Sequence, residues 1–160
     1  MSDEIPRGQT PAPGGNRYHQ TMKPDDLLER CGIHRPPVDV GAIARQLGVT
    51  VTFVGAADWD SAYDVGSRTL YVTEALTATR RRFAIAHGLG HALLHGGRQM
   101  AFRERFERQA ADPWELEANL FALRLLVPRY WALAYSGYEP VEAVARRFGV
   151  TPALVEMQLR

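Results

Sequence analysis

The stretch that decides the fold is RRRFAIAHGLGHALLH, residues 80–95, which predicts one mostly apolar helix. His87 and His91 are four residues apart, so their imidazoles leave one face of that helix about one turn apart and can converge on a single Zn²⁺. The zinc peptidase pattern H-E-x-x-H also has a glutamate after the first histidine, which activates the metal-bound water. Gly88 stands at that position here. The metal-binding frame is therefore present without its general base.

The apolar surroundings of the two histidines favour a metal over a chance pair. A buried histidine needs a hydrogen-bond partner or a metal, and two on one face need two. His95 continues the row, but it lies about 12 Å from His87 along the axis at about 1.5 Å per residue. All three cannot close on one ion. We interpret His95 as a residue behind the ligands or facing the substrate, with a purely structural role as the open alternative.

A catalytic zinc needs a third protein ligand and an open position. The best candidate lies on the helix predicted over 113–127. A helical wheel places Glu117 within the apolar part of this helix, and Glu115 on another polar strip beside Asn119. A carboxylate in an apolar stretch must be paired or metal-bound, which predicts Glu117 as the third ligand. An ion pair with Arg124, without any metal, is the alternative.

The remaining pattern predicts an α+β fold with helices around a small antiparallel sheet. β-branched alternation and a Gly66-Ser67 turn indicate a strand followed by a hairpin. The expected helices are 24–31, 38–47, 77–95, 113–127, 139–148 and 151–159, and the expected strands are 49–54, 60–65 and 68–72.

Composition predicts one soluble, cytoplasmic domain. With 160 residues, 46% of them hydrophobic, the chain can bury one ordinary core, which we place at 23–160. Residues 1–22 are rich in Pro, Gly and polar types and are expected to be flexible. A net charge of +1 is too small to argue by itself for nucleic acid or an anionic membrane, and the arginine run 80–82 is expected on a solvated face. The single cysteine, Cys31, fits a reducing compartment, and no apolar run is long enough for a signal or a membrane span.

The segment RRRFAIAHGLGHALLH followed by ELEANLFALRLLVP resembles the ImmA/IrrE family of metallopeptidases over roughly residues 38–148. The family pattern is approximately R-R-F-x-x-A-H-E-L-G-H-x-L-L-H, then E-A-N-x-F-A-x-x-L-L-x-P. The resemblance implies a helical, zincin-like metallopeptidase domain with His87, His91 and Glu117 as the ligands of Zn²⁺. Gly88 replaces the catalytic glutamate, so the resemblance implies zinc binding by this chain but not catalysis.

The resemblance also implies a partner. Members of this family are site-specific proteases that cleave helix-turn-helix repressors encoded nearby, and thereby switch on mobile elements, prophages or DNA-damage responses. Some occur in toxin–antitoxin-like pairs. A helix-turn-helix (XRE-type) repressor is therefore the expected substrate or binding partner, with no direct DNA binding and no membrane.

Three explanations of Gly88 are open: an engineered inactive variant, a natural pseudoprotease that binds without cutting, or another residue as the base. Glycine inside a helix costs about 1 kcal/mol against alanine. A second glycine on the metal face has no evident structural benefit, which favours a lost glutamate. The chain is expected to be inactive or nearly so.

Two further interpretations concern binding surfaces. Residues 139–160 resemble half of a helix-turn-helix, which makes a DNA-binding module the rival function. Against it, no basic recognition surface of the expected size is visible. For a protease, the strand 60–65 could offer a free sheet edge to an added substrate strand, with 98–112 as a surface helix or flap.

Overall fold

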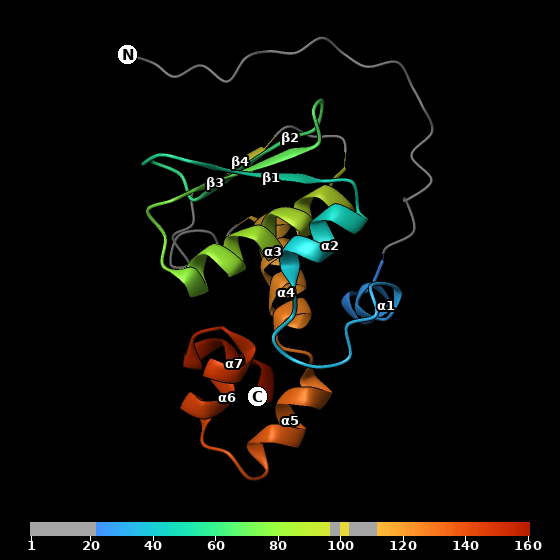
Figure 1. Ribbon diagram of the computed structural model, residues 1–160, viewed down its shortest axis with the longest axis vertical. Helices are drawn as coiled ribbons and strands as arrows, with labels where there is room; N and C mark the ends of the chain where they lie inside the picture. The colour runs from blue at the N-terminus through green and yellow to red at the C-terminus, as the bar shows by residue number, and fades with distance from the viewer. Residues whose placement is uncertain (1–21, 97–99, 103–111) are drawn as a thin grey trace.

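A helix layer covers one face of a small sheet in the computed structural model, which describes residues 22–96, 100–102 and 112–160 (Figure 1). This confirms the α+β prediction. The elements in chain order are α1 (Pro24–Arg30), α2 (Val40–Gln46), β1 (Thr50–Val54), β2 (Ser61–Asp64), β3 (Thr69–Thr73), α3 (Ala78–Leu94), β4 (Met100–Phe102), α4 (Pro113–Leu126), α5 (Arg129–Ser136), α6 (Val141–Phe148) and α7 (Pro152–Leu159). The segment 1–22, expected to be flexible, lies outside the described residues except for Met22.

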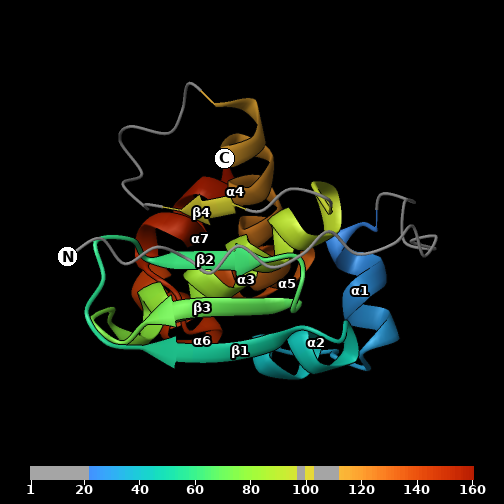
Figure 2. The same ribbon diagram turned by 90° about the horizontal axis from the view of Figure 1, so that it is seen from above.

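The sheet is mixed rather than purely antiparallel. Its strand order among the described residues is β1-β3-β2-β4, as Figure 2 shows from above. The hairpin β2–β3 is antiparallel as expected, but β1 pairs parallel to β3, with Thr50 opposite Thr69. Arg68 anchors this pairing: its carbonyl accepts from the Thr50 amide, and its guanidinium donates to the carbonyls of Leu47 and Gly48. These contacts join residues about 20 apart in sequence, so local pattern could not show them.

Strand β2 is internal, so the expectation that 60–65 provides a free edge is wrong. β4 pairs antiparallel with it and places Met100 opposite Tyr63. Among the described strands, β1 and β4 are therefore the edges. β4 lies within the 98–112 segment that the sequence suggested as a helix or flap, and its three residues are too few to show a period. Residues 97–99 and 103–111 lie outside the described part.

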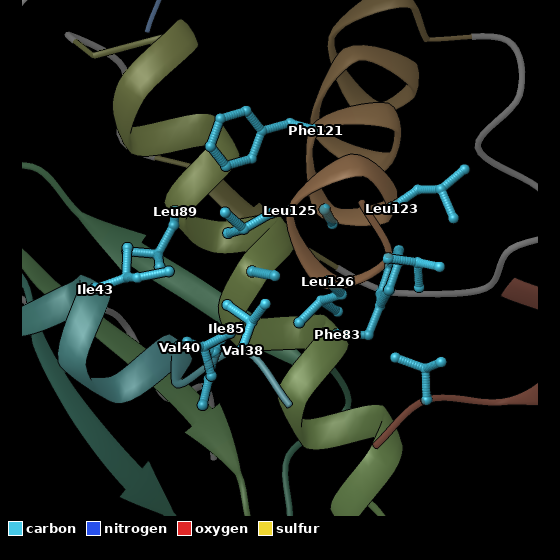
Figure 3. Packing of buried hydrophobic residues seen from close by; sticks show 14 of the residues in the cluster. Val38, Val40, Ile43, Phe83, Ile85, Leu89, Phe121, Leu123, Leu125 and Leu126 are labelled. Carbon is cyan, nitrogen blue, oxygen red and sulfur yellow. The ribbon is translucent and has the colours of Figure 1, made fainter. Parts of the chain in front are cut away.

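Helix α3 is the centre of the fold. The Thr77 side chain accepts from the Arg80 amide at its start, and every residue from Phe83 to His91 is buried. A helix buried on all sides must be contacted by other elements on all sides. The sheet covers one side of α3, and α4 packs against another. Figure 3 shows Phe121, Leu125 and Leu126 of α4 beside it.

Helix α5 was not anticipated, because Pro128 was interpreted only as the end of the preceding helix. It is also the N-cap of α5, where the missing N–H of proline costs no hydrogen bond within the helix. Trp131 of α5 is buried, with its ring centroid 6.5 Å from that of Phe148. Within the described residues, no helix is long and apolar enough to cross a membrane.

Arg82 corrects the expectation that Arg80–Arg82 form a solvated face. Its half-buried guanidinium donates to the carbonyls of Val38, Phe148 and Gly149. These hydrogen bonds connect α3 to the segment before α2 and to the end of α6. Burial lowers the pKa of Arg82. Arg80 by contrast is exposed, and its Nη2 lies 3.4 Å from Asp60 Oδ2.

Replacing Arg82 with methionine is expected to lower the free energy of unfolding by about 2–3 kcal/mol, because three carbonyls lose a charged donor. Arg80→Met is the matched control and should cost less than about 1 kcal/mol, since its ion pair is exposed to solvent. Urea unfolding of both variants measures the difference. Equal losses would show that the Arg82 contacts contribute no more than a surface pair.

Candidate metal centre

His87 and His91 meet at the interface between α3 and α4. Both side chains are buried, and their Nε2 atoms lie 3.1 Å apart. The i, i+4 spacing produces this convergence, as the sequence predicted. The interface is close because Gly90 faces α4: a Cβ at that position would lie 3.3 Å from the Ala118 backbone. Two nitrogen atoms are thus held together away from bulk water.

Glu115, on the first turn of α4, completes the cluster. Its Oε2 lies 3.2 Å from His87 Nε2, and its Oε1 lies 3.2 Å from His91 Nε2. The three candidate ligand atoms lie within 4.8 Å of one another. Two imidazoles and one carboxylate are a donor set that catalytic zinc takes, with a fourth position left open.

The structure brings Glu115, rather than the predicted Glu117, to the two histidines. The Glu115 side chain is 9% exposed, whereas that of Glu117 is 61% exposed and lies outside the cluster. The helical wheel failed because Leu116 and Leu120, which looked like core residues, are exposed at 47% and 37%. Small residues define the face of α4 that meets α3. Ala118 and Ala122 are fully buried there, and Glu115 precedes them by three and seven positions on the same face.

The electrostatics favour the forms that bind a metal ion. Burial raises the pKa of the Glu115 carboxyl, but the adjacent imidazoles of His87 and His91 outweigh it and lower the pKa to about 2. Burial lowers the pKa of His91, although the neighbouring Glu115 opposes this. An ionised carboxylate and neutral imidazoles are the states that ligate metals.

Two observations show that the cluster suits a cation. His87 Nδ1 lies 2.8 Å from Asn119 Oδ1, and in the tautomer that donates Nδ1–H to this amide oxygen, Nε2 presents a lone pair to the cluster. Glu115 Oε2 is buried and has no hydrogen-bond partner among the described residues. A buried carboxylate oxygen without a donor is costly, and a bound cation removes that cost.

Gly88 faces the sheet rather than open space. A Cβ at this position would lie 2.4 Å from Leu70 Cδ1 and 2.8 Å from Leu70 Cδ2. Leu70 on β3 is fully buried. The glycine thus allows close contact between α3 and the sheet, a structural role that the sequence interpretation did not include. Local pattern could not indicate this contact because the two residues lie on different elements.

His95 lies at the end of α3, behind His91 and outside the metal cluster. Its Nδ1 is 2.9 Å from His91 Nδ1, and its Nε2 is 2.9 Å from Glu117 Oε2. Of the two sequence interpretations, the position behind the ligands matches this geometry. Glu117 thus belongs to the surroundings of His91 through His95.

The family model of the IrrE N-terminal-like domain matches residues 44–160. This chain belongs to that family. It is a metallopeptidase family, so the resemblance stated from the paired motifs is confirmed. The two motifs that carried the resemblance lie on α3 and α4, the helices that form the cluster.

Two curated relatives of this IrrE-like domain carry informative names. An uncharacterized immunity region protein 2 of Bacillus phage phi105 is 30% identical over 97 residues, which is 60% of this chain and 61% of that protein. The radiation response metalloprotease IrrE of Deinococcus deserti is 29% identical over 140 residues, which is 84% of this chain and 47% of that protein. The chain therefore spans about half to three fifths of the length of these relatives.

A solved structure shows the same fold as the IrrE-like chain. A Mycobacterium tuberculosis transcriptional regulator superposes with a TM-score of 0.57 at 21% sequence identity, covering 82% of this chain and 44% of that one. At this identity the likeness extends to the fold alone.

Proposed function

We propose that this protein binds one Zn²⁺ through His87, His91 and Glu115, and uses the centre to hold a helix-turn-helix repressor that it cleaves slowly or not at all. The observation that carries the metal assignment is the convergence of two imidazole nitrogens on one buried carboxylate. Zinc accepts this donor set with one position open for water or substrate.

Different residues of the chain would have different roles at such a zinc centre. When bound, zinc supplies a Lewis acid that polarises a carbonyl oxygen or a water molecule. Asn119 orients His87, and burial keeps bulk water from the ligands. Gly88 has no side chain that could accept a proton at the position where the family has its glutamate. Loss of a general base typically lowers the rate by about 10²–10⁴-fold, so residual cleavage at most is proposed.

The packing at Gly88 bears on how a glutamate would fit there. Leu70 fills the space where a side chain at position 88 would begin. A larger residue at this position would therefore require the end of the Leu70 side chain to move.

The family and the names of two relatives support a helix-turn-helix repressor as the partner. One relative comes from a phage immunity region and another is a radiation response metalloprotease. Both contexts agree with the repressor partner that the ImmA/IrrE resemblance implied, and the cytoplasmic location is proposed together with that partner. The structure offers little support for the rival DNA-binding function. The apolar stripe of α6 packs into the core, where Val144, Ala145 and Phe148 are buried.

The test of this function is a binding experiment with the zinc-loaded chain and the helix-turn-helix protein encoded beside its gene. Size-exclusion chromatography with light scattering should show a complex that persists for hours with the repressor intact, because the base is absent. A gel shift with duplex DNA and the chain alone should show no tight, salt-sensitive binding. Strong DNA binding without the repressor would favour the helix-turn-helix function, and rapid cleavage would show that another residue acts as the base.

A further inference from the structure

A row of hydrogen bonds runs from the metal cluster to the surface of α4. His91 Nδ1 lies 2.9 Å from His95 Nδ1, and His95 Nε2 lies 2.9 Å from Glu117 Oε2. His91 directs its other nitrogen, Nε2, at Glu115 Oε1, 3.2 Å away. Each imidazole therefore uses both ring nitrogens, and the order along the row is Glu115, His91, His95, Glu117.

Only one arrangement of protons satisfies this row when His91 is a ligand. Ligation through Nε2 requires that this nitrogen carry no proton, so the proton of neutral His91 lies on Nδ1. His91 Nδ1–H then donates to His95 Nδ1, which must be an acceptor. His95 in turn carries its proton on Nε2 and donates it to the Glu117 carboxylate. The carboxylate at the end of the row thus determines the tautomer of both histidines.

Packing fixes the His95 ring in the plane that the row needs. Its side chain is only 6% exposed, although Glu117 beside it is largely in solvent. The ring stacks on Trp114, with centroids 4.8 Å apart and planes 18° apart. Contacts with His91, Glu117 and Trp114 therefore restrain His95 on three sides. Neither ring nitrogen is left to face a substrate, which argues against the substrate-facing interpretation.

His87 provides an internal comparison. Its Nδ1 lies 2.8 Å from the Asn119 amide oxygen, which performs in one residue what His95 and Glu117 perform in two. Helix α4 supplies Glu117 and Asn119 from its first two turns, and His95 lies at the end of α3. Both candidate ligands on α3 are thus held by acceptors on the side away from the cluster.

We propose that His95 and Glu117 are positioning residues that hold His91 in the tautomer and orientation needed to bind the metal. This inference rests on the metal centre proposed above. Partners behind metal-bound histidines typically contribute about 10–100-fold in metal affinity. His95 should lie at the upper end of that range because it contacts the ligand directly, and Glu117, which acts through His95, at or below its lower end.

A pair of substitutions at position 95 separates the hydrogen bond from simple packing. His95→Leu keeps an apolar volume but has no acceptor, and should weaken zinc binding by about 30–100-fold. His95→Asn places an amide oxygen where Nδ1 lies, as Asn119 does for His87, and should stay within about fivefold of wild type. Glu117→Ala should weaken binding by about 3–10-fold, and Glu156→Ala, which removes an exposed carboxylate of α7, should have no effect.

Zinc affinity is measured by chelator competition on the full chain, after circular dichroism has shown that each variant is folded. Long-range ¹H–¹⁵N correlation spectra of the zinc-loaded wild type should show the proton on Nδ1 of His91 and on Nε2 of His95. A folded His95→Leu variant with wild-type affinity, or a His95 proton on Nδ1, overturns this inference while the metal centre stands. Absence of zinc binding by wild type would overturn the metal centre itself, and this inference with it.

Discussion

Replacing Glu115 with glutamine should weaken zinc binding by roughly 10²–10³-fold, because a total of ~10–16 kcal/mol is shared among three or four ligands. The same change at Glu117 should cost less than about tenfold, since Glu117 is hydrogen-bonded to His95 and lies outside the cluster. The two residues lie two positions apart on α4 and differ in which face they occupy. Both substitutions remove one charge and keep the side-chain shape, so each controls for the other.

Chelator competition with zinc, followed by metal analysis after dialysis, measures both affinities. His91→Ala provides a third comparison and should lose zinc as Glu115→Gln does. Loss of zinc in Glu117→Gln with retention in Glu115→Gln would contradict the structure and restore the carboxylate that the helical wheel selected.

Combining Gly88→Glu with Leu70→Ala should raise repressor cleavage by about 10²–10⁴-fold, the usual contribution of a general base. Gly88→Glu alone should be less effective. Its Cβ would lie 2.4 Å from Leu70 Cδ1, and overfilling a packed core costs about 1–3 kcal/mol. Leu70→Ala alone should be destabilised by about 2–5 kcal/mol and stay inactive. The double variant should recover part of both losses, because the glutamate methylenes occupy the space that Leu70 leaves.

Cleavage is followed on gels with zinc-loaded protein and the neighbouring repressor, and the free energies of unfolding come from urea titration of all four proteins. A folded, zinc-bound double variant that leaves the repressor intact would show that position 88 is not the place of the base, or that this repressor is not the substrate. Additive stability losses would show that residues 70 and 88 do not interact.

Local pattern was enough for most helices and strands, and for the pair of histidines. Apolar periodicity and stop residues identified α3 and α4 to within a few residues, since these signals lie within one element. The i, i+4 spacing of His87 and His91 determines their convergence in any α-helix. The missing glutamate at position 88 is likewise visible in the letters alone.

The third candidate ligand depended on how two helices pack. Glu115 and Glu117 are both carboxylates near the start of α4, and only the face that meets Gly90 distinguishes them. Small residues, Ala118 and Ala122, line that face because the two helices approach closely. A helical wheel based on hydrophobicity instead selects the face that carries the leucines. Hydrophobicity predicts burial on average, but closeness of approach selects small side chains.

The sequence by itself determined an α+β chain whose central helix carries two histidines four apart, with a glycine where the family pattern has a glutamate. Tertiary structure alone decided that Glu115 joins the histidines, that β1 pairs parallel to β3, that β4 covers the edge of β2, and that Leu70 lies against Gly88. Each of these contacts joins different elements that are far apart in the chain. Periodicity reports which side of an element is apolar, whereas the partner that covers this side is selected by the packing of the whole chain.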